Sequence, residues 1–176
     1  MKLSKKVVNK MQYLIRESKK SDSYDIMHVV TLAWNETYKG IVPDAFLNEL
    51  KQNEMERAQN HYNEFDKDIN KELVLEVDNK IVGFVRYGKS EDKDFTNCGE
   101  IIALYIIKKY HGYGYGKELV KEAKSRLKNM GFNSMIIACL KGNPSNEFYK
   151  HIGGKYVKDG IFERLNLQEN VYYFDI

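Results

Sequence analysis

The chain has 176 residues, of which 43% are hydrophobic and 30% are charged, and this is enough for one domain with a substantial core. Its 28 basic and 25 acidic residues leave a formal net charge of +3, and such mixed charge gives no support for nucleic-acid binding, which requires a concentrated basic face. Cys98 and Cys139 lie far apart without a CxxC spacing, and the four histidines form no ligand pattern. The sequence therefore indicates neither a disulfide framework nor a metal site.

The N-terminal segment is basic but has no apolar stretch of signal-peptide length. No run in the sequence approaches the length of a membrane span. We therefore expect residues 1–10 to form a flexible tail and residues 11–176 to form a single domain. We also expect a cytoplasmic protein with reduced thiols that does not associate with membranes.

The first part of the chain predicts a strand and then helices. A short strand is expected over residues 12–18, and Ser21 or Asp22 is a suitable N-cap for the helix that follows. Apolar residues of that helix recur at three- and four-residue steps as far as Thr37. Two further helical segments are expected at residues 43–50, with Pro43 in the first turn, and at residues 55–65.

The middle of the chain changes to strand patterns. Residues 72–77 and 80–88 are rich in β-branched and apolar residues, and Asp78-Asn79 between them supplies turn chemistry, which predicts a hairpin. The next strand, residues 100–109, holds seven consecutive apolar residues. Such a run is typical of a strand that is covered on both faces.

The last part of the chain alternates helices and strands. A helix follows the glycine-rich run at residues 108–116 and ends near Gly131, and residues 133–140 form a second doubly buried strand. A helix begins at Asn143-Pro144, and two more strands close the chain. This order predicts a mixed sheet with helices on both faces.

The glycine-rich run "KKYHGYGYGKELV", residues 108–120, lies between a strand and a helix, where free backbone N–H groups can bind an anion. It is not a P-loop, because Lys117 is followed by Glu118 and the required Ser or Thr is missing. It is also a poor dinucleotide fingerprint, because its glycines are spaced G-x-G-x-G and occur late in the chain. An ordinary turn and an anion site both remain open at this point.

Two motifs together resemble the GNAT superfamily of N-acetyltransferases. "ALYIIKKYHGYGYGKELV" is similar to the family's acetyl-CoA signature, a buried strand followed by Gln/Arg-x-x-Gly-x-Gly/Ala; His111 stands at the Gln/Arg position, and Gly114 and Gly116 at the two small positions. "NPSNEFYKHIGG" is similar to a second signature, an Asn before a helix that carries Phe-Tyr. The motifs occur in the family's order, and the resemblance extends over nearly the whole chain. It implies an α/β (mixed α+β) GNAT fold, with a mostly antiparallel mixed sheet of about six to seven strands and helices on both faces.

The resemblance also implies roles in binding acetyl-CoA, with no metal. Backbone groups of the central strand would pair with the pantetheine arm like an added strand, and the glycine-rich loop would hold the pyrophosphate. Asn143 would hydrogen-bond the cofactor's amide arm; it is also a natural helix N-cap, and the two roles are compatible. The implied cofactor-binding residues are Leu104, Tyr105, Ile106, His111, Gly112, Tyr113, Gly114, Tyr115, Gly116, Lys117, Asn143 and Tyr149.

Two residues are catalytic candidates. The resemblance implies that Tyr149 protonates the departing thiolate, which suits a phenol with a pKa near ~10; the alternative is a core tyrosine with a satisfied hydroxyl. Glu100 is the candidate base that deprotonates the amine, directly or through water, and the alternative is an ordinary strand-end carboxylate. Direct attack in a ternary complex needs no acyl-enzyme.

The sequence departs from the usual family pattern at two positions. His111 replaces the commoner Gln or Arg, and Asn146 occupies a site that is often Ala. Neither change removes a group that the chemistry requires.

The acceptor is expected over the thioester end of the cofactor. Residues 33–47 resemble a stretch found in bacterial GNAT enzymes that include polyamine acetyltransferases. Trp34 and Tyr38 would form an apolar wall, and Glu36, together with Asp44 and Glu49, would attract a cationic amine; the alternative is a core tryptophan and solvated acids. The sequence thus favours a small-molecule amine or polyamine as the acceptor.

Two alternatives to this function remain open. One is acetylation of a protein N-terminus or a lysine side chain, and the other is a non-catalytic acyl-CoA-binding regulatory module. A homodimer is also considered, in which residues 171–174 pair with a partner strand.

Overall fold

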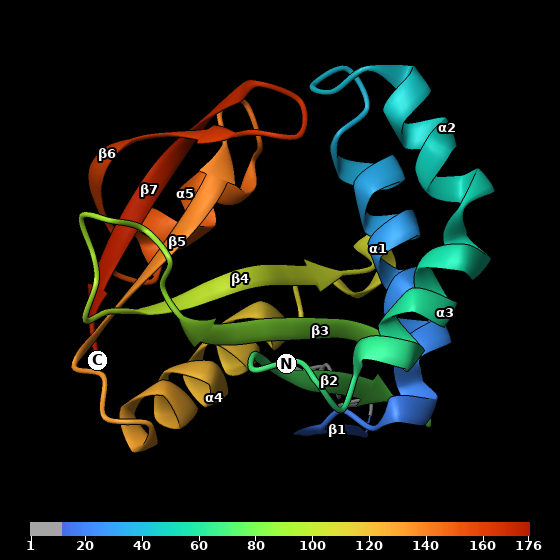
Figure 1. The fold of residues 1–176 in the computed structure, drawn as a ribbon, viewed down its shortest axis with the longest axis horizontal. Coiled ribbons are helices and arrows are strands. Elements are labelled where there is room, and N and C mark those ends of the chain that lie inside the picture. The colour runs from blue at the N-terminus through green and yellow to red at the C-terminus, as the bar shows by residue number, and fades with distance from the viewer. Residues whose placement is uncertain (1–11) are drawn as a thin grey trace, which may run out of the picture.

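The computed structural model describes residues 12–176, so the predicted tail at residues 1–10 lies outside the described part. Seven strands form one sheet in the order β1-β2-β3-β4-β5-β7-β6 (Figure 1). The strands are β1 (Tyr13–Glu17), β2 (Lys71–Val77), β3 (Lys80–Lys89), β4 (Gly99–Ile106), β5 (Ser134–Leu140), β6 (Lys155–Phe162) and β7 (Leu167–Asp175). The α-helices are α1 (Ser23–Thr37), α2 (Asp44–Gln52), α3 (Glu54–Glu64), α4 (Tyr115–Asn129) and α5 (Ser145–His151).

The sheet is antiparallel at every strand pair except β4–β5, which is parallel. The predicted mixed, mostly antiparallel sheet is therefore confirmed. The predicted hairpin is also confirmed, because Asp78 and Asn79 take φ angles of 49° and 62° in the two-residue turn between β2 and β3. Two positive φ angles are what a type I′ turn requires, and Asn and Asp tolerate them.

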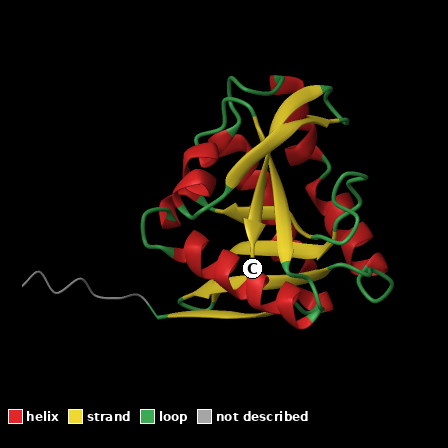
Figure 2. Ribbon diagram, turned by 90° about the vertical axis from the view of Figure 1, so that its left-hand side faces the viewer, coloured by secondary structure: helices red, strands yellow, loops and turns green. Residues whose placement is uncertain are grey.

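Helices cover both faces of the sheet (Figure 2). Successive side chains of β2 point to opposite faces, so Leu73 and Leu75 belong to the core beneath α4, while Val74 packs with Ile26 and Val29 of α1. Helices α2 and α3 pack beside α1, and α5 packs against β5 and β7. None of the helices among residues 12–176 has both the length and the apolarity that crossing a membrane requires.

Strand β4 has apolar contacts on both faces, as its apolar run predicts, but its burial is incomplete. Leu104 and Ile106 pack against the core on the α4 face, and Ala103 and Tyr105 pack against the cluster beneath α1, although all four are only half-buried and Ile102 is 43% exposed. The exposure arises because β4 pairs with β5 only over Gly99–Ile101, and the two strands then diverge (Figure 1). The strand also ends at Ile106, and residues 108–110 form a short 3-10 helix.

Strand β7 is paired on both edges, with β5 on one side and β6 on the other. Residues 171–173 therefore have strands on both sides, and Phe174 pairs with Met135 of β5, so the segment does not offer the free strand edge that the considered dimer pairing needs. The two edge strands of the sheet are β1 and β6.

Candidate active site

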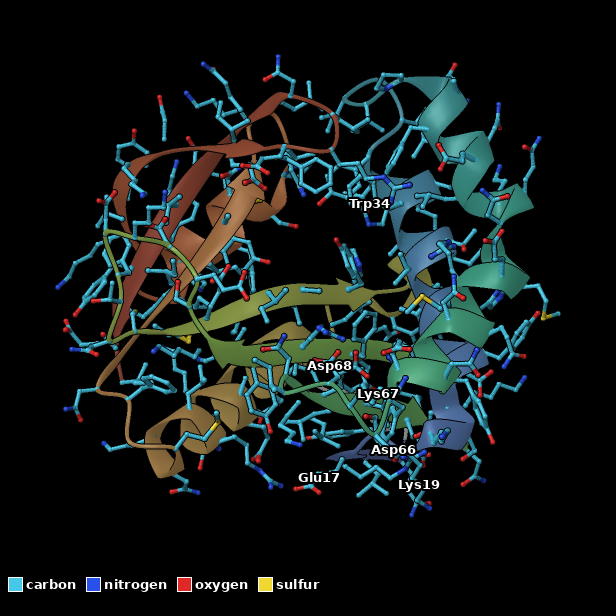
Figure 3. All side chains as sticks on the ribbon, in the orientation of Figure 1. Glu17, Lys19, Trp34, Asp66, Lys67 and Asp68 are labelled. Carbon is cyan, nitrogen blue, oxygen red and sulfur yellow. The ribbon has the colours of Figure 1, made fainter. Side chains whose placement is uncertain are left out.

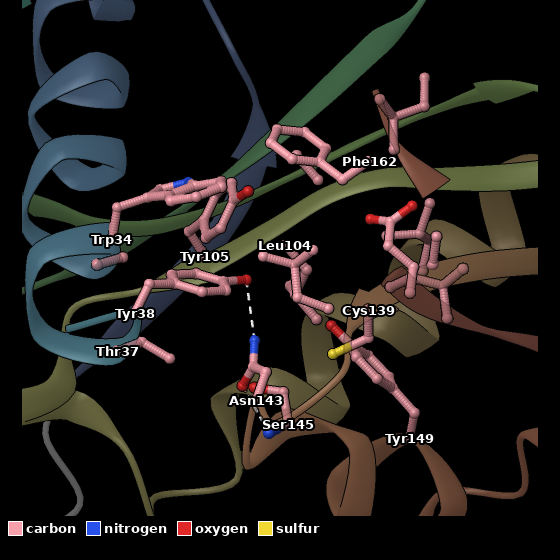
Figure 4. A pocket seen from close by; sticks show the side chains of 18 of the residues that line it. Trp34, Thr37, Tyr38, Leu104, Tyr105, Cys139, Asn143, Ser145, Tyr149 and Phe162 are labelled. Carbon is pink, nitrogen blue, oxygen red and sulfur yellow. Dashed lines mark hydrogen bonds between the residues drawn. The ribbon is translucent and has the colours of Figure 1, made fainter. Parts of the chain in front are cut away.

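A cavity of about 270 Å³ lies where β4 and β5 diverge. Its walls come from α1, β4, β5, the start of α5 and the β6–β7 hairpin (Figure 4). Most of the side chains that the sequence singled out meet here, although they are far apart in the chain. The predicted site residues that line the cavity are Trp34, Tyr38, Glu100, Leu104, Tyr105, Ile106, His111, Asn143 and Tyr149.

A second, larger cavity of about 760 Å³ lies between α3, β2 and the end of α4. It contains none of the predicted site residues, and several of its charged side chains are paired with one another. Arg86 contacts both Asp68 and Glu72, and Arg126 lies 2.6 Å from Glu17. The cavity between β4 and β5 is therefore the better candidate for an active site.

The glycine-rich loop lies next to the candidate cavity, at the N-terminus of α4. Gly112 and Gly114 have φ angles of +82° and +84°, and Gly114 is the N-cap of the helix. An L side chain is strained in this conformation, which explains glycine at both positions. Gly116 is glycine for another reason, because a Cβ atom there would lie 3.3 Å from Cζ of Phe148. The loop therefore leaves the N–H groups of the first helical turn approachable.

The side chains of this loop differ in where they point. Tyr115 is buried in the core and packs on Tyr13, with ring centroids 5.2 Å apart. Tyr113 and Lys117 are exposed. His111 is the loop residue that lines the cavity, and its Nε2 lies 2.8 Å from the carbonyl oxygen of Ile106. Since that carbonyl is an acceptor, Nε2–H donates, and the ring ties the loop to the end of β4.

Asn143 connects two walls of the cavity. Its Nδ2 donates a 2.9 Å hydrogen bond to the hydroxyl of Tyr38 on α1, shown as the dashed line in Figure 4. Its Oδ1 accepts a 2.8 Å bond from the N–H of Ser145. The N-cap position of α5 is Pro144, not Asn143 as predicted, but the Asn143 side chain satisfies the N–H of the first residue of α5 while it holds the end of α1 in place.

Asn146, which replaces the commoner Ala, is buried with its amide fully used. Its Nδ2 donates to the carbonyl oxygens of Leu140 and Asn143, and its Oδ1 accepts from Asn170 and from the hydroxyl of Tyr172. The hydrogen bond from Asn146 to the carbonyl oxygen of Asn143 fixes the turn on which Asn143, a residue that lines the cavity, is located. A buried amide is stable here because all these groups are satisfied.

Tyr149 and Cys139 face the cavity side by side (Figure 4). Burial raises the pKa of the Tyr149 hydroxyl well above its ordinary value, so the phenol stays protonated at neutral pH. Burial also raises the pKa of the Cys139 thiol to about 12. The thiolate, which is the nucleophilic form of cysteine, is therefore scarce at neutral pH.

Aromatic rings form the opposite wall. Trp34 projects from α1 toward the β6–β7 hairpin (Figure 3). Its ring stacks on Tyr38 with centroids 4.3 Å apart, and it lies 5.8 Å from the ring of Phe162 and 6.2 Å from that of Tyr105. Sequence reasoning anticipated Trp34 and Tyr38 here and expected a backbone role for Tyr105, but it missed Phe162, because nothing local shows that the β6–β7 hairpin reaches α1.

Two carboxylates line the cavity, Glu100 on β4 and Glu169 on β7. Burial raises the pKa of Glu100, although the nearby Ser90 and the N–H of Glu91 oppose the shift. Burial, and then the charge of Glu100, raise the pKa of Glu169. Glu169 was not anticipated from the sequence; strand alternation assigns it to a face of β7 but does not reveal that this face meets the cavity.

The acids expected near the acceptor lie elsewhere. Glu36 is outside the cavity, and its carboxylate accepts a 2.8 Å hydrogen bond from the N–H of Lys108, so it supports the segment after β4. Glu49 lies 2.9 Å from Arg164, and Asp44 is exposed in the first turn of α2. Among residues 12–176, no group of three or more His, Cys, Asp and Glu side chains is placed to hold a metal ion.

Comparisons with known proteins agree with this geometry. The model of the acetyltransferase (GNAT) family matches residues 18–153. The chain is 28% identical over 151 residues to the uncharacterized N-acetyltransferase YuaI of Bacillus subtilis (strain 168), a match that covers 85% of this chain and 84% of that protein.

Solved structures share the whole architecture. The PaiA N-acetyltransferase of Thermoplasma acidophilum, in complex with coenzyme A, has a TM-score of 0.76 at 20% identity, over 94% of this chain and 100% of that chain. The ribosomal-protein-alanine N-acetyltransferase of Brucella melitensis has a TM-score of 0.63 at 22% identity, over 93% of this chain and 99% of that chain. At these identities the two relationships show a shared fold alone, and the predicted fold is confirmed.

The raised pKa of Glu169 predicts a pH-dependent stability. The ordinary glutamate pKa is 4.5 and the folded value is higher, so ionisation costs free energy only in the folded state, and the cost grows as the pH rises above 4.5 through the folded value. Glu169→Gln removes this cost. We expect the variant to gain stability over the wild type at about pH 8 but not at about pH 4, measured by urea unfolding.

The matched control is Glu163→Gln, which removes the same charge from the exposed β6–β7 turn. A gain that is equal at both pH values, or equal in the two variants, would contradict the assignment of the cost to burial of Glu169.

Proposed function

The chain belongs to the acetyltransferase (GNAT) family and is an N-acetyltransferase, and we propose that it transfers an acetyl group from acetyl-CoA to the primary amine of a small amine or polyamine. One observation carries the proposal. A single cavity contains a protonated buried phenol, the diverging end of β4, an aromatic wall and two carboxylates. These are the groups that direct acetyl transfer to an amine requires.

The residues around β4 and α4 fit the donor. Beyond Ile101, β4 continues without β5 beside it, so Leu104 to Ile106 offer an edge to which an amide-containing arm can add like a strand. Gly112 and Gly114, both with positive φ, place no side chain before the N-terminus of α4, where N–H groups favour phosphate. The crystallisation of the Thermoplasma protein with coenzyme A supports the same donor. Acetyl-CoA supplies an acetyl group already activated as a thioester.

Tyr149 is the proposed general acid. Its hydroxyl faces the cavity and stays protonated at neutral pH, because burial raises its pKa. A proton donated from this hydroxyl neutralises the sulfur as the thiolate leaves. Cys139, with a thiol pKa of about 12, is not expected to form an acyl-enzyme, so the amine attacks directly within a ternary complex.

Glu100 is the proposed general base. An ammonium ion has no lone pair, so the acceptor must lose a proton before it attacks. The raised pKa of Glu100 makes its carboxylate a better proton acceptor near neutral pH. The carboxylate takes the proton directly or through water.

The shape of the cavity favours a small acceptor over a polypeptide. The cavity is about 270 Å³ and is bordered by the rings of Trp34, Tyr38 and Phe162. A protein N-terminus or lysine remains the main alternative, since the Brucella protein named as a ribosomal-protein-alanine acetyltransferase shares the fold. The fold therefore does not choose the acceptor, and a direct assay is needed.

An acceptor panel tests the proposed function. Release of coenzyme A from acetyl-CoA is measured with polyamines, small monoamines, amino acids, aminoglycosides and peptides that carry a free N-terminus or lysine. We expect turnover with small amines. Turnover with peptides alone would contradict the small-amine acceptor, and binding of acetyl-CoA without turnover on any acceptor would favour a non-catalytic module.

Tyr149→Phe tests the general acid. Because only the hydroxyl is lost, we expect kcat to fall about 100-fold or more, while the affinity for acetyl-CoA, measured by calorimetry, stays within about 2-fold. Tyr24→Phe, at an exposed tyrosine of α1, is the control and should retain full turnover. An unchanged kcat in Tyr149→Phe would remove this hydroxyl from the mechanism.

A further inference from the structure

Glu100 and Glu169 lie on the same face of the sheet. Glu100 pairs with Ile136 of β5, and Glu169 pairs with Leu140 of the same strand. Ile136 and Leu140 are four residues apart, and side chains of a strand repeat every two residues, so all of them share one face. Both carboxylates line the cavity.

The two carboxylates serve different parts of the cavity. Their Cα atoms are separated by two strand spacings, roughly 10 Å, and by four residues along the strands, roughly 13 Å. Glu100 therefore lies toward the shared end of β4 and β5, and Glu169 lies toward the β6–β7 hairpin and the aromatic wall. One elongated acceptor can approach both.

Glu169 differs from Glu100 in its partners. Ser90 and the N–H of Glu91 lie close enough to the Glu100 carboxylate to lower its pKa and so oppose the effect of burial. Within residues 12–176, no hydrogen bond or ion pair to the Glu169 carboxylate is found, and the charge of Glu100 adds to the cost of its burial. A half-buried carboxylate in this position gains most from a cation.

The basic side chains on the neighbouring segments do not supply that cation, because each is paired elsewhere. Lys141 lies 3.0 Å from Asp159, Lys158 lies 2.7 Å from Asp92, and Arg164 lies 2.9 Å from Glu49. A cation that pairs with Glu169 would therefore come from outside the described residues. In the proposed reaction the acceptor is the cationic molecule that enters this cavity.

We propose that Glu169 is a specificity-determining residue that binds a second cationic group of the acceptor, distant from the nitrogen that is acetylated. The inference rests on the proposed small-amine function and narrows it to acceptors with two cationic groups joined by an apolar chain. Glu100 serves the reacting nitrogen, Glu169 holds the other charge, and the rings of Trp34 and Phe162 contact the methylene groups between them.

Matched acceptors test this division. A series of α,ω-diaminoalkanes of increasing length is compared with the amino alcohols in which a hydroxyl replaces one ammonium group. We expect the wild type to prefer the diamine of best length over the matching amino alcohol by about 10-fold to 100-fold in kcat/KM, mainly through a lower KM. This is the size of effect expected when a partly buried charge pair is lost. Glu169→Gln should abolish the preference by raising KM for the diamine, with the amino alcohol changed less than about 2-fold.

Two control variants separate the effects. Glu163→Gln removes the same charge from the exposed turn of the hairpin and should keep the preference for diamines. Glu100→Gln should lower kcat with diamines and amino alcohols alike. Thermal unfolding of each variant checks that it is folded.

The outcomes are distinguishable. Equal losses for diamine and amino alcohol in Glu169→Gln, or an unchanged preference, would overturn the role of Glu169 while the proposed function stands. Turnover of peptides but of neither amine series by the wild type would instead contradict the proposed function itself, and the inference with it.

Discussion

The parallel pairing of β4 with β5 joins only Gly99–Ile101 to Met135–Ile137, and the candidate site depends on where that pairing stops. Where β4 and β5 are paired, they belong to a continuous sheet with a core on each face. Beyond Ile101 and Ile137 the two strands diverge, and the space between them becomes a cavity lined by residues of both strands. A fully paired β4 would fill this space with backbone hydrogen bonds and leave no edge to which another extended molecule can add.

The walls of the cavity are held by buried polar groups that are almost completely satisfied. Asn143 joins α5 to Tyr38 of α1, and Asn146 joins α5 to β5 and β7. These bonds give the turn a single arrangement, because an unsatisfied buried amide costs about 1–3 kcal/mol. Glu169 is an exception, since its carboxylate is half-buried without a hydrogen bond or ion pair among residues 12–176. An unpaired, half-buried carboxylate lowers the stability of the folded protein, and such a cost is typical of a side chain whose partner is a bound substrate.

The local features of the fold were predictable from the sequence, and those that depend on distant segments were not. Asp78-Asn79 predicts a hairpin because the turn requires residues that tolerate positive φ, and Gly114 marks the start of α4 for a similar reason. The apolar run of β4 predicted burial on both faces, but composition does not reveal that the neighbouring strand turns away. The acceptor-binding role predicted for Glu36 likewise used only the local sequence. In the structure its carboxylate accepts a hydrogen bond from the N–H of Lys108, 72 residues further along the chain, which the local sequence does not reveal.

The motif resemblance located more of the candidate site than residue patterns did. Tyr149, Asn143 and the edge of β4 line one cavity, although no local pattern brings them together. Glu169 and Phe162 were missed because they come from the β6–β7 hairpin, outside both motifs. The acceptor side of the cavity is thus the part for which the three-dimensional structure was indispensable.

The most direct test of this account is amide hydrogen exchange of β4, residue by residue, with and without saturating acetyl-CoA. If acetyl-CoA adds to the diverging end of the strand, its binding should slow the exchange of those amides of residues 102–106 that face β5 by at least about 10-fold. Amides of the first turn of α4 should be protected with them, and those already paired with β3 should change little. Saturable binding without added protection in residues 102–106 would contradict the account.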